Sequence, residues 1–229
     1  MDTGLYIAAS GMLAQQVRQD QLANDLSNAS TPGYKTDASV QQDFGAMLLA
    51  NTATGQTIGP LNTGVRVGTP VTDLTPSTLH STGQPLDFGI AGQGFFAVRT
   101  AQGTRYTRDG QFQASAQGYL VDGQGNQVLS QNNAPIAVSA QGTVPAASLG
   151  VFNLTAATKQ GNNLFTGTPA GRGTGTVRQG ELEDSAVDPV NTMVHMMTAM
   201  QTYQSGENAI QTIASTMQES AQHVGSLGG

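Results

Sequence analysis

Apolar and small residues near the C-terminus recur at alternating steps of three and four, the spacing of a helix with one continuous packing seam. The seam positions are Met196, Ala199, Tyr203, Gly206, Ile210, Ile213, Met217, Ser220, Val224 and Leu227. The helix is predicted to begin at Asp188-Pro189, because aspartate is a good helix cap and proline suits the first turn. A helix this long and this one-sided requires a partner that covers its seam.

A second helix is predicted at the N-terminus, where residues 2–30 contain no proline. Its apolar or small positions follow a similar spacing and are Leu5, Ala8, Met12, Leu22 and Leu26, with Gln15 and Gln19 in the two middle positions. Gly4 and Gly11 lie beside this seam, and each glycine costs an isolated helix about 1 kcal/mol. That cost favours a site where another helix comes close.

The first helix is predicted to stop at the turn Thr31-Pro32-Gly33. Proline disfavours the helical conformation in the residue before it, and glycine adopts the positive φ that a turn requires. The helix therefore ends by Ser30.

The chain between this turn and Asp184 is rich in glycine and in short β-branched or aromatic runs, as expected for strands and turns. The run "RYTRDGQFQASAQGYLVDGQGNQVL" predicts a meander of hairpins with turns at Asp109-Gly110, Gln117-Gly118 and Asp122-Gly123. "GIAGQGFFAV" and "GVFNLTAA" are two further predicted strands. Residues 51–64 lack apolar periodicity and are interpreted as a loop or an extended arm.

These segments predict an α+β fold. Heptad-bearing helices at the two termini pair or assemble, and they flank a central Gly-rich, mainly antiparallel β domain. The predicted division is residues 1–30 for the N-terminal helix, 31–64 for the turn and an extended linker, 65–184 for the β domain and 185–229 for the C-terminal helix.

Composition excludes several function classes. Only 10% of the residues are charged and the net charge is −6, whereas nucleic-acid binding needs a patch of Lys and Arg. The absence of cysteine excludes disulfide scaffolds and thiolate metal sites. No apolar run is long enough to span a membrane. The first residues also lack the basic start and apolar core of a secretory signal, so a chain that leaves the cytoplasm needs another route.

The residues that could carry chemistry have weak patterns. His80, His195 and His223 show no metal-ligand spacing, and no Ser or Cys is marked as a nucleophile. The glycines of "GIAGQGFF" (Gly89, Gly92 and Gly94) lack the order of a phosphate loop, and the turn at Asp122 lacks the closing Glu of a calcium loop. The methionines of "MVHMMTAM" favour packed core over an adaptable binding face. We expect no catalytic residue, no cofactor and no metal.

Assembly is the function class that these observations leave. A chain poor in charge, with seam-bearing helices at both ends, is interpreted as a subunit that buries its ends against neighbours. Two alternatives from other classes are a secreted β-rich binding or adhesin domain with helical flanks, and a hydrolase built on the β meander. Growth of fibres with concentration would distinguish the first class from the other two.

Three stretches resemble one known family. "GLYIAASGMLAQQVRQDQLANDLSNASTPGYK" is similar to the N-terminal signature of the bacterial flagellar rod and hook (axial) proteins. "LDFGIAGQGFFAV" with the run that follows it resembles the β-domain motif of that family, and "LEDSAVDPVNTMVHMMTAMQTYQSGENAIQT" resembles its C-terminal signature. The chain departs from the family by carrying Asp25, Ala186 and Asp188 in place of Asn, Thr192 and Gln204 in place of Glu, and Gln201 in place of Arg.

The resemblance implies a structural subunit and no enzyme. The one middle domain looks like that of the distal-rod type, in which terminal helices form an inner tube and the rod transmits motor torque to the hook. The implied partners are copies of itself, other rod and hook subunits, and the flagellar type III export apparatus, with no nucleic acid and no membrane insertion. The implied location is the flagellar basal body, in the rod that crosses the periplasm, with export that removes no signal peptide. A hook or other axial subunit is the alternative within the family.

The predicted assembly interface follows the two seams. It consists of Leu5, Ala8, Met12, Leu22 and Leu26 on the first helix, and Met196, Ala199, Tyr203, Ile210, Ile213, Met217 and Val224 on the second. Thr31, Pro32, Gly33 and Tyr34 form the turn that is the hallmark of the family.

Overall fold

The computed structural model of the protein describes residues 2–39, 41–43, 46–50, 57–62 and 64–226, and their side chains over residues 4–39 and 64–222. The chain divides into two compact units. The helical unit contains Met1–Leu26, Asp37–Val71 and Pro189–Gly229, and the β unit contains Ser27–Thr36 and Thr72–Asp188. The α+β prediction is confirmed, since one helix precedes and one helix follows a mainly antiparallel β region in the order of the chain.

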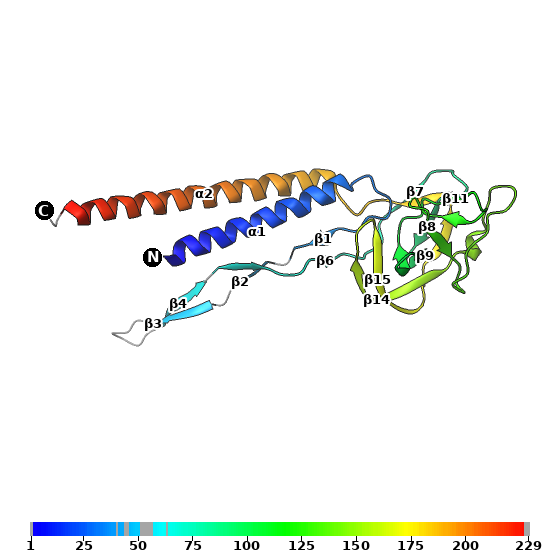
Figure 1. The fold of residues 1–229 in the computed structure, drawn as a ribbon, viewed down its shortest axis with the longest axis horizontal. Helices are drawn as coiled ribbons and strands as arrows, with labels where there is room; N and C mark the ends of the chain where they lie inside the picture. Colours follow the sequence, from blue (N-terminus) through cyan, green and yellow to red (C-terminus); the bar gives the residue numbers. More distant parts are fainter. Residues whose placement is uncertain (1, 40, 44–45, 51–56, 63, 227–229) are drawn as a thin grey trace. The chain divides into compact units, whose positions relative to one another are not determined.

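The helical unit is built on two helices that lie side by side, α1 (Asp2–Ser27) and α2 (Pro189–Ser226) (Figure 1). They run in opposite directions, because Gly4 faces Ile213 and Gly206 faces Met12. The predicted boundaries are confirmed at both places where proline and glycine indicated them: α1 ends before Ser30, and α2 begins at Pro189.

An extended arm of short strands completes the helical unit. Its strands are β1 (Asp37–Ala38), β2 (Gln41–Asp43), β3 (Ala46–Ala50), β4 (Thr57–Asn62), β5 (Val65–Val67) and β6 (Val71–Thr72), of which β3 pairs with β4, β2 with β5 and β1 with β6. Residues 51–64 were predicted to form a loop or an extended arm. Over β4 the loop is wrong and the extended arm is correct, since β4 pairs with β3. Strand pairing joins backbone groups and does not need apolar side chains. Residues 51–56 and 63 lie outside the described residues. The arm contacts α1 through the Val65 amide, which donates to Ser10 Oγ over 3.2 Å.

The β unit contains the remaining strands. They are β7 (Leu79–Ser81), β8 (Phe88–Ala91), β9 (Phe95–Thr100), β10 (Gly103–Thr107), β11 (Gln113–Ala114), β12 (Leu120–Val121), β13 (Gln127–Leu129), β14 (Val151–Lys159), β15 (Leu164–Arg172), β16 (Thr176–Gln179) and β17 (Glu181–Glu183), with a 3-10 turn η1 (Ala146–Ser148). The main sheet has the order β10-β15-β14-β9-β13-β12-β11, and β10 also pairs with β9, so four of its strands close into a ring. Two outer pairs, β8–β16 and β7–β17, each join a strand near the start of this unit's sequence to a strand near its end.

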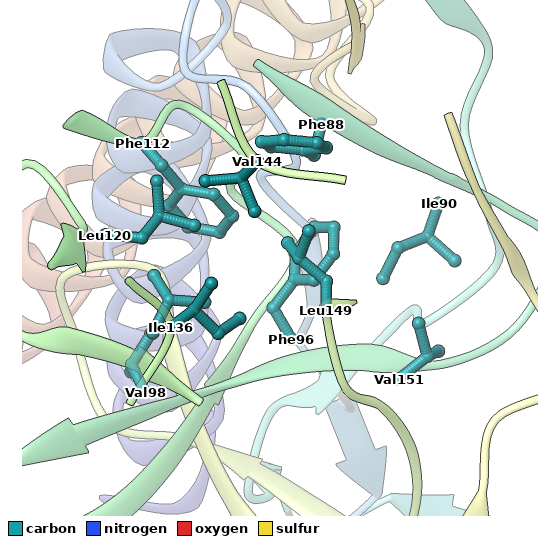
Figure 2. Close-up of a cluster of buried hydrophobic side chains, with 11 residues drawn as sticks. Phe88, Ile90, Phe96, Val98, Phe112, Leu120, Ile136, Val144, Leu149 and Val151 are labelled. Carbon is teal, nitrogen blue, oxygen red and sulfur yellow. The ribbon is translucent and has the colours of Figure 1, made fainter. Parts of the chain in front are cut away.

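Strand β9 lies at the centre of the core because both of its faces are buried. Phe96 and Val98 enter one hydrophobic cluster, with Phe112 packed edge-on against Phe96 at 5.3 Å between ring centroids. Figure 2 shows this cluster. Phe95 and Ala97 point the other way, into a second cluster. The continuous apolar run in "GFFAV" is therefore that of a strand covered on both sides.

The predicted meander is confirmed for two of its three turns. Hairpins β11–β12 and β12–β13 form around Gln117-Gly118 and Asp122-Gly123. The hairpin expected at Asp109-Gly110 is wrong, since β10 pairs with β9 and β15. There the Gly110 carbonyl accepts a hydrogen bond from the Phe88 amide over 3.0 Å, so the turn is held by a distant strand.

The two Asp-Gly turns provide a matched test of this packing. A Cβ atom at Gly110 would lie 1.6 Å from the Phe88 carbonyl oxygen, whereas a Cβ at Gly123 would meet no atom within 4 Å. We expect Gly110→Ala to lower the free energy of unfolding by about 3 kcal/mol, because backbone must move. Gly123→Ala should leave it unchanged or raise it slightly. Urea unfolding of the full chain measures both, and equal losses would contradict the packing at Gly110.

Candidate functional site

The seam of α2 coincides with its covered side. Met196, Tyr203, Ile210, Ile213 and Met217 are half-buried and Ala199 is buried, while most residues between these positions are exposed. The side chain of Val224 lies outside the described residues. The covered side faces α1 at two described points, Gly206 against Met12 and Ile213 against Gly4.

The predicted seam of α1 is half-buried at all five positions, Leu5, Ala8, Met12, Leu22 and Leu26. Ala14, which the sequence analysis did not select, is the most covered apolar residue of this helix at 2% exposure. A Cβ at Gly206 would lie 2.8 Å from Met12 Cγ, so glycine permits close approach there. Among the described residues, no such neighbour lies within 4 Å of a Cβ position at Gly11. Whether these seams join subunits stays a prediction.

A second apolar face on each helix is exposed. On α2 it consists of Val190, Met193, Val194, Met197 and Met200, with exposures of 45–71%, and on α1 of Tyr6, Leu13 and Val17. The interpretation of "MVHMMTAM" as packed core is therefore wrong for three of its four methionines, since only Met196 faces the covered seam. Exposed apolar residues gathered in this way are typical of an interaction surface.

The hallmark turn is docked into the β unit. Gly33 and Tyr34 are buried, and Thr31 and Pro32 are half-buried. The Gly33 amide donates to the Glu183 carbonyl over 2.8 Å, and the Tyr34 carbonyl accepts from the Ala186 amide over 2.9 Å.

Glycine is required at position 33 for two reasons. Its φ is +64°, and a Cβ would lie 2.4 Å from the Arg108 carbonyl oxygen. Lys159 also braces the turn, because its Nζ donates to the Lys35 carbonyl over 2.8 Å and lies 3.8 Å from the Tyr34 ring centroid.

Directly after the turn, a buried ion cluster joins three distant segments. The Lys35 ammonium lies 2.6 Å from Glu183 Oε1, and Arg108 Nη1 lies 2.9 Å from Glu183 Oε2. All three side chains are at most 1% exposed. The Ser77 amide donates to Glu183 Oε1 over 2.8 Å, and Lys35 Nζ also donates to the Thr75 carbonyl over 2.6 Å.

The electrostatics of this cluster are asymmetric, since two cations share one anion. Burial lowers the pKa of Lys35 below its usual value, and the hydrogen bond and attraction to Glu183 oppose that shift. The guanidinium of Arg108 also donates to the Gly92 carbonyl over 2.9 Å and lies 5.2 Å from the Phe95 ring centroid. Glu183 is therefore the group on which the burial of both cations depends.

This cluster is not predictable as a site from the sequence. In the sequence, Lys35 and Glu183 stand within the two terminal signatures, and Arg108 within the β motif. The available signal was a charged residue beside apolar neighbours in a chain with few charges, as in Tyr34-Lys35 and Leu182-Glu183. That signal does not indicate which charges meet.

Two of the residues considered for metal chemistry, Asp122 and His80, make other contacts. The carboxylate of Asp122 accepts hydrogen bonds from the backbone amides of Gln124 and Asn126, within its own turn. His80 Nδ1 lies 2.6 Å from Asp184 Oδ1 on the exposed side of the β7–β17 pair. Among the described residues, no three His, Cys, Asp or Glu side chains gather as metal ligands would. None of the described helices is long and apolar enough to cross a membrane.

The ion cluster predicts a difference between two substitutions. Glu183→Gln leaves two buried cations around a neutral amide and should lower the free energy of unfolding by about 3–5 kcal/mol. Lys35→Met leaves the Arg108–Glu183 pair balanced and should cost less than about 2 kcal/mol. Urea unfolding of the full chain measures both values. A Lys35→Met loss as large as that of Glu183→Gln would contradict the central role of the carboxylate.

Three family models match the chain in order. A model described as flagella basal body rod protein matches residues 5–35, one described as flagellar hook protein FlgE/F/G D1 domain matches residues 89–149, and one described as flagellar basal body rod FlgEFG protein C-terminal matches residues 178–222. They contain, respectively, α1 with the docked turn, the centre of the β unit, and β17 with most of α2.

Curated relatives extend the similarity over almost the whole chain. The flagellar basal-body rod protein FlgG of Bacillus subtilis (strain 168) is 32% identical, over 94% of this chain and 96% of its own length. FlgG of Borreliella burgdorferi is also 32% identical, over 93% and 95% of the two chains. The rod protein FlgF of Caulobacter vibrioides is 27% identical over 99% of this chain and all of its own. The chain belongs to the family of flagellar basal-body rod proteins.

Proposed function

We propose that the chain is a structural subunit of the flagellar basal-body rod, of the distal type, which polymerises into the axial drive shaft that transmits motor torque to the hook. The observation that carries this proposal is the extent of the similarity to FlgG. At 32% identity it includes both terminal helices and the β unit, and nearly the full length of the relative. Three FlgG relatives at 32% identity, each over more than 90% of this chain, favour the FlgG type over FlgF at 27%.

The two seams supply the assembly interface in this proposal. Seam residues of α1 and α2 are mostly half-buried in a single chain, so part of their apolar surface is still available to neighbours. Each Å² of that surface stabilises a contact by about 25 cal/mol when it is removed from water. Helix α2 carries two formal carboxylates, Glu207 and Glu219. Repulsion between so few charges opposes the close packing of neighbouring helices only weakly.

A torque-bearing subunit also requires a stiff connection after its first helix. The hallmark turn meets this requirement, since it is fixed by backbone hydrogen bonds to Glu183 and Ala186 and followed by the buried Lys35. Residues in such a fully bonded segment have little freedom to rotate under load.

The proposed setting follows from family membership. The partners are copies of the chain and other rod and hook subunits, and the location is the basal body, where the rod crosses the periplasm. Export proceeds through the flagellar type III apparatus without a cleaved signal peptide. The chain has no enzymatic role in this proposal.

A charge on the α2 seam should prevent assembly. Ile213, half-buried against Gly4, would become a poorly solvated carboxylate in Ile213→Asp, at a cost of several kcal/mol per subunit. We expect cells that carry only this variant to lose rods and swimming. The matched control is Ser215→Asp, an exposed position on the same helix, which should assemble normally. Normal rods with Ile213→Asp would contradict the proposed interface.

Export should require the flagellar apparatus. This expectation rests on the similarity of the chain to flagellar basal-body rod proteins. In cells that lack the type III export gate, the chain should stay inside the cell, while a periplasmic reference protein with a signal peptide is exported as usual. Detection of the native chain outside the cytoplasm of such cells, by fractionation and immunoblotting, would contradict this route.

A further inference from the structure

The methionines of α2 fall into two groups that differ in exposure. Met193, Met197 and Met200 are 45%, 63% and 55% exposed. Met196 and Met217 are half-buried on the covered seam. We propose that the three exposed methionines, here called the thioether cluster, are a reversible oxidation site, at which hydrogen peroxide forms methionine sulfoxides and so prevents the free chain from assembling. This inference rests on the proposed function, because only a chain that polymerises has an assembly step to prevent.

The composition directs a peroxide to the methionines. The chain contains eight methionines and no cysteine, so it has no thiol that would react with the oxidant first. The sulfur of a methionine must be reached by the peroxide oxygen, and exposure therefore decides which thioethers react. The thioether cluster gathers three accessible sulfurs within eight residues of one helix.

The cluster occupies a strongly apolar part of the helix. Its members are separated by four and then three positions, so they lie on one side of α2 over adjacent turns. Val190 and Val194 extend the same exposed apolar surface, at 71% and 55% exposure. Residues 189–206 include no Asp, Glu, Lys or Arg. Sulfoxides formed here would therefore be strongly polar groups in an otherwise apolar surface.

Each oxidation transfers one oxygen atom. The lone pair of the thioether sulfur attacks one oxygen of hydrogen peroxide, the O–O bond breaks and an S–O bond forms. The other oxygen takes up the proton of the transferred oxygen and leaves as water. The sulfur loses two electrons and the peroxide gains them. Methionine sulfoxide reductases restore the thioether, so the modification is reversible.

Oxidation of the cluster affects assembly more than folding. The three side chains are exposed in the single chain, so a sulfoxide there remains in water and leaves the packed seam intact. Polymerisation would remove that group from water, and a polar group buried without a hydrogen-bond donor is costly. The backbone amides of α2 cannot supply the donor, because they are bonded within the helix. A covered cluster would also be shielded from peroxide, so the site acts on the chain before it assembles.

Mass spectrometry of the full-length chain tests the site directly. The purified chain is treated with hydrogen peroxide, and the sulfoxide at each methionine is followed with time by digestion and fragmentation. The chain has no Lys or Arg after Arg178, so trypsin leaves all methionines of α2 in one peptide. We expect the thioether cluster to oxidise several-fold faster than Met196, its half-buried neighbour. Equal rates at Met196 and Met197 would overturn the site.

A pair of variants tests the consequence for assembly. The combined variant Met193→Leu, Met197→Leu and Met200→Leu keeps the surface apolar and removes its three sulfurs. The matched control is Met196→Leu with Met217→Leu, on the covered seam. Cells that lack methionine sulfoxide reductases and carry one version of the chain receive a sublethal pulse of hydrogen peroxide while new rods form. Electron microscopy of basal bodies should show that the wild type and the control lose most new rods, and that the combined variant keeps them.

The outcomes separate the oxidation site from the proposed function. Equal loss of rods by the wild type and the combined variant would overturn the role of the cluster in assembly, and so would normal rods in the treated wild type. A second measurement needs no variant: return of the reductases to treated wild-type cells should restore rods, and failure to do so would overturn reversibility. Absence of the chain from the rods of untreated cells would overturn the proposed function, while the oxidation rates still decide the site.

Discussion

One carboxylate holds the β unit together at the point where its most distant segments meet. Glu183 binds Lys35 and Arg108 and accepts the Ser77 amide, while its carbonyl accepts the Gly33 amide. The residue directly after the hallmark turn, the segment before β7, the segment after β10 and strand β17 thus share a single anion. Its removal would leave two cations in the core with no counter-charge, so the position of the turn depends on it.

The local features of the fold followed from the sequence. The two helix boundaries and two hairpins were predictable because proline, glycine and Asp-Gly act within a few residues of where they stand. The features that could not be predicted are long-range. Nothing near Gly110 shows that its carbonyl pairs with Phe88, and nothing near residues 57–62 shows that β4 pairs with β3. Such pairings depend on which distant strand arrives at the same place.

The candidate site also has one part that the sequence predicts and another that it does not. Periodicity identified the stripe of α2 that includes Ala199 and Ile213, and that stripe is the covered side of the helix. Met193, Met197 and Met200 lie on a neighbouring stripe, one residue or about 100° around the helix, and the sequence does not indicate whether the chain covers it. A single sequence shows that a face is apolar. It does not show whether the partner of that face is in the same chain or in another copy.

The distance along the chain between the partners of the ion cluster affects when the β unit can form. Lys35 and Glu183 are 148 residues apart, and strands β7 and β8 also wait for β17 and β16. At a synthesis rate of about 5–20 residues per second, Glu183 leaves the ribosome roughly 7–30 s after Lys35. During that interval Lys35 has no anion to bind, and strands β7 and β8 have no partner strands. The β unit therefore cannot close its ion cluster or its outer strand pairs until almost all of the chain has been made.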